Sequence, residues 1–258
     1  VLPACGFTAP ASQEFKAWEI GGIEYNAGDD YVVLGNTEIK ALWKDSAVIP
    51  TTFTITFNAN GGTGSMSDTK VVYGTSTAIR TNTFTRSGYQ FSGWIAHRMS
   101  DNSWIYKDSS SLSDKWITVG DSTSGYFLKA YPDGCSVSKT SSTDRDIVTF
   151  YAAWTRITGE TYPTTLVAGT DFTFKGTVES DAGLYEVKLV ITDSSGNVKV
   201  SKAVNPKTNT YNVANLNSSI TTANLSAGSY IYRVYATTMS GANSKTTVTV
   251  LSKTFTVT

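Results

Sequence analysis

The sequence predicts a mostly β protein, and two observations carry that prediction. The chain of 258 residues contains 14 Tyr, 11 Phe and 6 Trp, and these lie among many Thr, Ser and Val residues. Branched and aromatic side chains suit the pleated, half-buried surface of a strand. Short alternating stretches bounded by Gly, Asn, Asp and Ser also recur along the chain, as in strands joined by turns. The length allows two ordinary domains or three small ones.

Charge and hydropathy exclude several classes of partner. The chain has 21 basic and 21 acidic side chains, so no net field attracts nucleic acid, and we expect no nucleic-acid partner. No stretch of 18 apolar residues occurs, so we expect no membrane insertion. The opening residues VLPACGF lack the basic segment and apolar core of a signal peptide, so we expect any export signal to lie outside this sequence.

The segment 54–94 carries the most specific pattern. It contains an expected strand at 55–58, a glycine turn that permits positive φ, and a second expected strand at 70–73. In order it includes F-N-A-N-G-G-T-G, V-V-Y-G-T and F-T-R-S-G-Y-Q-F-S-G-W. This pattern resembles the InlB B-repeat, also called the Listeria-Bacteroides repeat, of extracellular bacterial surface proteins. The resemblance implies a β-grasp-like unit at 52–155 and an extracellular location, secreted or attached to the cell surface.

Residues 1–45 resemble a partial copy of the same repeat. Four of their apolar residues align with four residues of the later copy: Leu2, Phe7, Phe15 and Trp18 with Ile79, Phe84, Phe91 and Trp94. The partial copy lacks the F-N-A-N-G-G hairpin. Either the missing strands lie upstream in a longer protein, which we favour, or the unit is naturally short. In both cases we expect it to lean on a neighbouring unit.

The copy at 52–155 departs from the repeat pattern through an aromatic insertion at about 98–132. The flanking Trp residues are 60 positions apart in this copy and 25 apart in the first, so 35 residues are extra. The favoured interpretation is an additional hairpin whose aromatic side chains form a satellite core. The alternative is a platform that stacks on sugar rings, formed by Trp104, Tyr106, Trp116 and Tyr126.

The sequence pattern of residues 160–258 predicts a different domain. We expect one linker at 44–51, before the complete repeat, and a second at 158–164, before this domain. The segment 225–232, LSAGSYIY, resembles the approach to a tyrosine corner, and the region resembles bacterial Ig-like domains of Gram-positive secreted proteins. That resemblance implies an Ig-like β-sandwich. Its expected strands are 172–178, 184–192, 198–204, 211–213, 229–238, 246–250 and 254–258.

Candidate chemistry is sparse. The single histidine, His97, completes no Ser-His-Asp or Cys-His pattern, so we expect it to lie on the surface or to pack in a hairpin. The acidic residues lie mostly in turns, and no pair indicates a glycosidase. We interpret the pairs at 29–30 and 144–146 as turn caps, with an oxygen-ligand calcium site as the alternative. We therefore expect no catalytic residue, no metal, no cofactor and no enzyme activity.

Two interpretations of the cysteines stay open. Cys5 and Cys135 are too few for a disulfide framework and too far apart in sequence for a metal knuckle. The favoured interpretation is two free thiols. The alternative is a long-range disulfide that closes a loop of about 130 residues.

The leading functional interpretation is a non-catalytic adhesion or spacer module of a Gram-positive surface or secreted protein. A first alternative is a carbohydrate-binding module that uses the insertion aromatics. A second is the accessory region of a cell-wall hydrolase. The expected partner is a polysaccharide, a cell wall or a host surface protein, and we expect a monomer.

Overall fold

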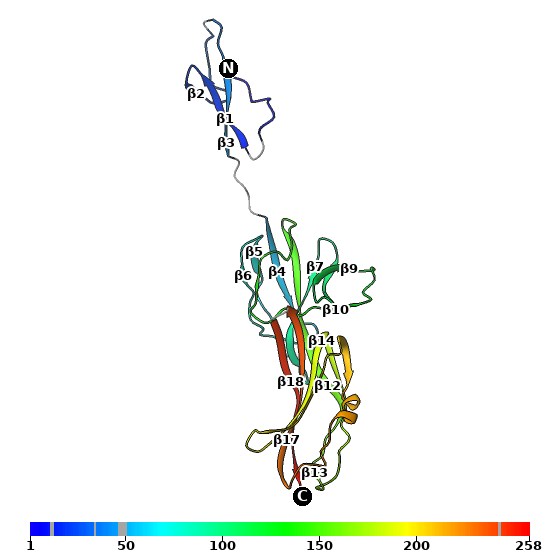
Figure 1. Ribbon diagram of the computed structural model, residues 1–258. Coiled ribbons are helices and arrows are strands. Elements are labelled where there is room, and N and C mark those ends of the chain that lie inside the picture. Colours follow the sequence, from blue (N-terminus) through cyan, green and yellow to red (C-terminus); the bar gives the residue numbers. More distant parts are fainter. Residues whose placement is uncertain (11–12, 34, 46–50, 242–243) are drawn as a thin grey trace. The chain divides into compact units, whose positions relative to one another are not determined.

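The computed structural model describes residues 1–10, 13–33, 35–45, 51–241 and 244–258. The described residues form strands for the most part, which confirms the mostly β fold class. The chain divides into two compact units, unit 1 (Val1–Pro50) and unit 2 (Thr51–Thr258), shown in Figure 1.

Unit 1 is a small antiparallel sheet with the strand order β2-β1-β3. Its strands are β1 (Gln13–Ile20), β2 (Ile23–Tyr25) and β3 (Ile39–Asp45). A β-bulge between Phe15 and Ala17 interrupts the two-residue alternation of β1. Phe15 and Trp18 therefore join the same apolar cluster although they are three residues apart. Leu2 and Ile20 complete the buried part of that cluster.

The first part of unit 2 is built around two neighbouring strands that run in the same direction. Its strands are β4 (Thr52–Asn58), β5 (Thr69–Val72), β6 (Thr77–Ala78), β7 (Gln90–Arg98), β11 (Ser136–Val137) and β12 (Asp146–Thr161). β4 pairs in parallel with β12, and β7 pairs antiparallel on the other edge of β12. The buried first core consists of Phe53, Ile55, Val71, Ile79, Phe84, Trp94, Ala96, Ile105, Val137, Val148, Phe150, Ala152 and Trp154.

Two glycines of the repeat motif are required by close contacts. A Cβ atom on Gly62 would lie 2.8 Å from the carbonyl oxygen of Thr85 and 2.9 Å from the Trp154 ring. Gly93 has a φ of +122°, and a Cβ there would lie 2.6 Å from the Tyr131 carbonyl oxygen. Both positions therefore exclude larger residues, which gives a physical reason for glycine at two places in the motif.

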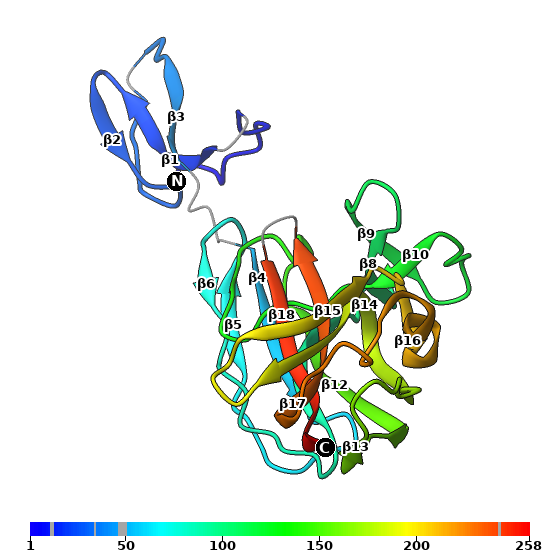
Figure 2. The ribbon, with the colours of Figure 1, turned by 60° about the horizontal axis from the view of Figure 1, so that its bottom comes forward.

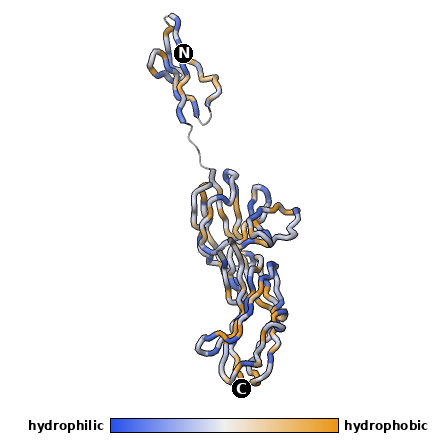
Figure 3. The backbone as a smooth tube through the Cα atoms, in the orientation of Figure 1, coloured by the Kyte–Doolittle hydropathy of each residue, from blue (hydrophilic) through white to orange (hydrophobic). Residues whose placement is uncertain are grey.

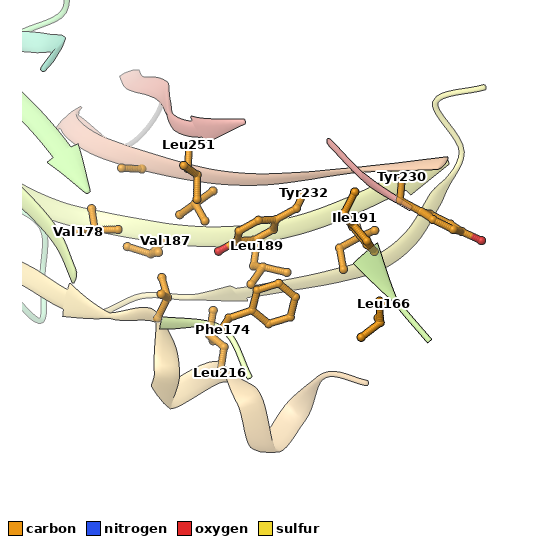
Figure 4. Close-up of a cluster of buried hydrophobic side chains, with 14 of the residues drawn as sticks. Leu166, Phe174, Val178, Val187, Leu189, Ile191, Leu216, Tyr230, Tyr232 and Leu251 are labelled. Atoms are coloured by element: carbon orange, nitrogen blue, oxygen red, sulfur yellow. The ribbon is translucent and has the colours of Figure 1, made fainter. Parts of the chain in front are cut away.

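The second part of unit 2 surrounds a separate second core (Figure 4). Its elements are β13 (Thr165–Leu166), β14 (Lys175–Asp193), β15 (Val198–Val204), β16 (Thr208–Asn212), the 3₁₀ helix η1 (Val213–Ser219), β17 (Gly228–Gly241) and β18 (Ser244–Val257). Phe174, Leu189 and Tyr232 lie together at its centre. The Tyr230 hydroxyl donates to the Ser226 carbonyl oxygen at 2.8 Å, the kind of bond that a tyrosine corner makes.

Two strands of this part are longer than the sequence predicts. The expected strands 172–178 and 184–192 lie largely in the single strand β14, and 246–250 and 254–258 lie largely in β18. The residues at 180–183, Ser-Asp-Ala-Gly, have a turn-like composition. They stay extended because β14 changes partners there, from β12 up to Ser180 to β17 from Leu184. Figure 3 shows hydrophobic and hydrophilic residues interspersed along these strands.

β12 joins the two parts of unit 2. Phe150 and Trp154 of this strand belong to the first core, whereas Ile157 packs against the second core. The expected linker at 158–164 is wrong over 158–161, because β12 continues to Thr161 and pairs there with β14. The expected domain boundary between 155 and 160 thus lies inside β12, the strand that is labelled in Figure 2. Of the other expected linker, residues 46–50 lie outside the described residues.

Candidate binding surfaces of the insertion

The insertion forms three strands on the edge of β7. They are β8 (Ser103–Asp108), β9 (Asp114–Thr118) and β10 (Tyr126–Leu128). β8 lies in the middle, with β9 on one edge and with β7 and β10 on the other. This arrangement agrees with the interpretation of the insertion as an additional hairpin that has its own secondary structure.

The four aromatic residues predicted as one stacking platform lie on two opposite faces. Trp104 and Tyr106 share one face of β8, since alternate residues of a strand point the same way. Tyr126 lies opposite Asp108 in the pairing of β10 with β8, and so joins that face. Trp116 lies opposite Ile105, so its ring points to the other face. The structure therefore brings three of the four together and separates Trp116 from them.

Trp104 is half-buried inside unit 2. Its ring stacks on the His97 ring at 4.5 Å between centroids, and the Tyr151 ring lies 5.1 Å away. It also packs, with Leu128, against a cluster that includes Ala182 of β14. Much of its surface is thus occupied by packing within the protein. His97 is buried in the same place, which confirms the packing role expected for it.

Tyr106 and Tyr126 form a small half-buried patch with Lys115. The Lys115 Nζ lies 4.9 Å from the centre of the Tyr126 ring and donates to the Tyr126 hydroxyl at 3.3 Å. Burial raises the pKa of Tyr106 above its usual value. These side chains offer two phenol groups and one cation to solvent.

Trp116 lines a hollow of about 260 Å³ on the opposite face. The guanidinium of Arg98 lies 4.5 Å from the Trp116 ring, which holds the indole in place from outside the hollow. The other lining residues are Ile105, Asp114, Tyr131, Ser136, Val137, Ser138, Lys139 and Thr140. An indole beside hydroxyl groups and a carboxylate is the kind of surface that binds a sugar ring.

Two buried lysines share the carboxylate beside this hollow. Lys107 Nζ lies 2.6 Å from Asp114 Oδ1, and Lys129 Nζ lies 2.7 Å from Asp114 Oδ2. Burial lowers the pKa of Lys129 below its usual value, although Asp114 acts in the opposite direction. Lys129 also lies over the Tyr131 ring at 4.0 Å, and burial raises the pKa of Tyr131 well above its usual range.

The sequence pattern does not reveal this triad of Lys107, Asp114 and Lys129. Lysine is rarely buried unless it is paired, so the alternation of β8 alone did not indicate that Lys107 points inward beside Ile105. The signal that could have found it is the strict alternation of Ser103, Ile105 and Lys107, all three of which are buried.

The insertion also contacts the second part of unit 2. The Phe127 ring lies directly on Gly183 of β14, in the space that a Cβ atom would need. Lys207 Nζ donates to the Ser109 carbonyl oxygen. Beside these contacts, the Asp181 carboxylate accepts hydrogen bonds from the Trp154 amide and from Asn60 Nδ2, both at 3.0 Å. Phe127 and Trp104, together with Leu128, therefore lie between the two parts, whereas Tyr106, Tyr126 and Trp116 do not.

The candidate acidic pairs take part in local hydrogen bonds. Asp29 accepts from the Asn26 amide, and Asp144 accepts from the Thr52 amide. Asp146 is buried and accepts from the Ser100 amide and from the Ser141 hydroxyl. In the described part of the chain, no three His, Cys, Asp or Glu side chains gather in a group that could hold a metal ion.

Both cysteines are free thiols in the structure. Cys5 is half-buried in unit 1 and Cys135 is half-buried in unit 2. Burial raises the pKa of the Cys135 thiol to about 11. The long-range disulfide stays a prediction, to be decided by thiol chemistry.

These features can be compared with known proteins. Residues 53–119 match the family model of the Listeria-Bacteroides repeat domain. The match covers β4 from its second residue, β5, β6, β7 and the first two strands of the insertion, and it includes 67 of the 258 residues. This repeat is a non-catalytic domain of surface proteins. No curated protein matches the chain. Among the described residues, no helix is long and apolar enough to cross a membrane.

Proposed function

We propose that this chain is a non-catalytic module of a Gram-positive bacterial surface or secreted protein, and that unit 2 is a stiff spacer which carries adhesive or catalytic domains at a distance. The observation that carries the proposal is β12, which belongs to both cores of unit 2. A hinge between the two parts would have to break the pairing of β12 with β14, from Thr155–Ser180 to Thr161–Lys175.

Buried polar contacts at the same place support stiffness. Thr155 Oγ1 donates a hydrogen bond at 2.9 Å to either of two serine hydroxyls, Ser92 and Ser180. Thr238 Oγ1 donates to the Ser92 carbonyl oxygen at 2.7 Å. These residues come from β7, β12, β14 and β17. Separating the two parts would leave buried donors and acceptors without partners, which costs about 1–3 kcal/mol for each group.

The wider biological context of the proposal rests on the repeat match. A surface-protein repeat at 53–119 supports an extracellular location. Adhesion to a cell wall, a polysaccharide or a host protein fits a module with zero net charge. An accessory role beside a cell-wall hydrolase is a variant of the same spacer function. Identifying the domains encoded next to this segment in the gene would distinguish the hydrolase variant from an adhesion protein.

The spacer function predicts that both cores of unit 2 unfold together. Native-state hydrogen exchange at increasing urea should give the same opening free energy for the slowest amides of β4 and β17. Thr155→Val should lower both values together by about 1–3 kcal/mol, because the valine cannot make the buried hydrogen bonds. Thr256→Val, at an exposed position of β18, is the control and should lower neither. Opening of β4 at clearly lower urea than β17 would mean that the parts move independently.

A second candidate function is glycan binding at the Trp116 hollow, which we propose because the hollow combines an indole, a tyrosine and hydroxyl groups. Affinity electrophoresis of the chain in starch, xylan, mucin and peptidoglycan should then show retardation in one of these polymers. Trp116→Ala should weaken that binding by about 1–3 kcal/mol, as expected for an aromatic anchor. A melting curve of the variant checks that the fold is intact.

Tyr126→Ala is the matched control for this test, since Tyr126 lies on the opposite face of the same insertion. It should leave the retardation unchanged. If Tyr126→Ala abolishes binding and Trp116→Ala does not, the tyrosine patch is the site and the hollow is not. Absence of retardation in all four polymers rejects glycan binding and leaves the spacer function.

A further inference from the structure

The triad beside the Trp116 hollow buries more positive than negative charge. Lys107 and Lys129 are 4% and 6% exposed, and both bind the same carboxylate, that of Asp114. Charged groups are rarely buried unless they are paired. Two ammonium groups that share one carboxylate leave one positive charge without a counter-charge, in a place that water barely reaches.

Lys129 is the lysine whose charge is less well compensated. Lys107 Nζ donates to the Leu112 carbonyl oxygen at 2.9 Å in addition to Asp114. In the part of the chain that the structure describes, Lys129 Nζ has Asp114 Oδ2 as its one acceptor, although an ammonium group has three N–H donors. The Tyr131 ring, 4.0 Å away, covers another side of this ammonium group. An anion close to Lys129 would therefore compensate a charge that the fold leaves open.

The hollow lies one layer of side chains away from this ammonium group. The two partners of Lys129, Asp114 and Tyr131, both line the hollow, as does Trp116. A ligand that touches Asp114 and Tyr131 is thus separated from Lys129 by these side chains alone. A charge acts more strongly through such a layer of protein than through the same thickness of water. The buried excess of positive charge therefore reaches a ligand in the hollow.

The other charged groups around the hollow do not cancel this excess. Lys139 is exposed and lines the hollow, so it adds a further cation. Arg98, which lies over the Trp116 ring, is paired with Asp101. Asp133 lies outside the lining of the hollow, and its carboxylate accepts hydrogen bonds from a backbone amide and from an indole of the first core. An anion in the hollow thus meets net positive surroundings.

The uncharged lining groups suit a sugar that carries this anion. Trp116 and Tyr131 offer ring faces on which a sugar ring can lie. Ser136, Ser138 and Thr140 offer hydroxyl groups, which donate to a carboxylate and exchange hydrogen bonds with sugar hydroxyls. A small inorganic anion would use the charge and leave the ring faces uncovered. A carboxylated sugar uses both.

We propose that the Trp116 hollow binds a carboxylated sugar, a uronic acid or a sialic acid, whose ring lies on Trp116 and whose carboxylate lies towards Lys129 and Lys139. The site is the one proposed above for glycans, so its acid specificity rests on that function. The sugar carboxylate supplies the counter-charge that the triad lacks. A neutral sugar of the same shape therefore binds less tightly.

The test titrates matched oligosaccharides into the full chain labelled with ¹⁵N. Trigalacturonic acid and sialyllactose are each compared with their methyl esters, which keep the sugar and remove the charge. At least one acid should shift the Trp116 indole signal saturably and bind about tenfold or more tightly than its ester, because a charge-assisted contact is gained. The acid that does so distinguishes a uronic acid from a sialic acid. Added sodium chloride should reduce the difference.

Lys129→Met separates the charge of this lysine from its packing. Methionine keeps a flexible buried stem and removes the charge, while Lys107 and Asp114 remain as a one-to-one pair. The ratio of acid to ester affinity should fall about tenfold, so that the two ligands bind nearly equally. Damage to the shape of the hollow would instead weaken both ligands and leave their ratio as it was. A melting curve checks that the variant is folded.

Two exposed lysines form a matched pair that does not threaten the fold. Lys139→Gln removes the cation that lines the hollow and should weaken the acid by roughly two- to fivefold, as for an exposed ion pair. Lys202→Gln makes the same change in β15, in the second part of unit 2, and should leave the affinity unchanged. Equal loss in both variants would mean that net charge alone holds the acid, which overturns the proposal.

The esters separate failure of acid specificity from failure of glycan binding. If an ester shifts the Trp116 signal and binds as tightly as its acid, the hollow is a glycan site without acid specificity. The glycan function then stands and the acid specificity is overturned. If neither acid shifts the Trp116 signal, the acid specificity is overturned as well, and the electrophoresis described above decides whether the hollow binds any glycan.

Discussion

Three adjacent residues of β14, Asp181, Ala182 and Gly183, carry contacts that their turn-like composition does not reveal. Asp181 accepts hydrogen bonds from the first part of unit 2, and burial raises the pKa of its carboxyl above the usual value. Ala182 packs in the cluster that contains Trp104. Gly183 leaves room for Phe127. Small side chains at these positions allow the insertion to approach β14.

Gly183→Ala tests that role at a single atom. The added methyl group would overlap the Phe127 ring, so we expect a loss of unfolding free energy of about 1–3 kcal/mol, as for overpacking in other cores. Urea unfolding followed by tryptophan fluorescence measures the change. Gly35→Ala is the matched control, because a Cβ atom there would meet nothing within 4 Å and its φ is not in the left-handed region.

The double variant Gly183→Ala, Phe127→Ala separates overlap from other effects. Without the Phe127 ring, the methyl group has space, so the cost of Gly183→Ala should largely vanish in that background. An unchanged cost would show that the strain comes from the backbone of β14 and not from Phe127.

At the scale of single residues, the aromatic positions were more predictable than the polar ones. The alignment of Phe15 and Trp18 with Phe91 and Trp94 depends only on local spacing, which is set by the bulge in each strand. The burial of Lys107 depends on Asp114, which is seven residues further along the chain and begins the neighbouring strand β9, so no local pattern encodes it. Buried charges need partners, and partners come from the tertiary fold.

At the scale of elements, the insertion replaces a short turn. In unit 1, Trp18 pairs with Tyr25 across the turn at Gly21 and Gly22. In unit 2, Trp94 forms a bridge with Tyr131, and the whole insertion lies between them. The extra strands thus leave the repeat core in place and extend from it towards β14.

Replacing residues 95–130 with residues 19–24 of unit 1 tests what the insertion contributes. We expect the first core to lose stability and the slowest amides of β4 to open at lower urea than those of β17, because Phe127 and Leu128 no longer pack on β14. Hydrogen exchange followed by mass spectrometry measures both regions. If β4 and β17 still open together in the variant, β12 alone couples the two cores.

The strands themselves were largely predictable from alternation, but their lengths were not. Alternation of Tyr185, Val187 and Leu189 with polar residues predicted the second half of β14 correctly. The continuity of that strand through 180–183 depends on its change of partner, which is long-range information. The same reason applies to β12, where the expected linker continues a strand because β14 pairs with it.

At the scale of the whole molecule, the mostly β class followed from composition, whereas the sharing of β12 between two cores did not. The two cysteines belong to the same scale, because a disulfide between Cys5 and Cys135 would join unit 1 to unit 2. Two free thiols would leave the two units without this covalent cross-link.

Thiol labelling distinguishes these states. With two free thiols, the unfolded chain should react with two equivalents of iodoacetamide without reductant. In the native chain at pH 8, Cys135 should react much more slowly than after unfolding, because its pKa of about 11 keeps the thiol protonated. Peptide mapping by mass spectrometry assigns each label. Labelling of the unfolded chain only after reduction would establish the disulfide.

The parallel pairing of β4 with β12 sets how unit 2 bears mechanical load. A force applied at Thr51 pulls β4 along its own axis towards its N-terminal end. This direction is opposite to the chain direction of β4 and β12. β12 continues from that pairing towards β14 and the part of unit 2 that ends at Thr258. The force therefore acts across all six residue pairs at once, from Phe53–Asp146 to Asn58–Tyr151, and loads them in shear instead of opening them one after another.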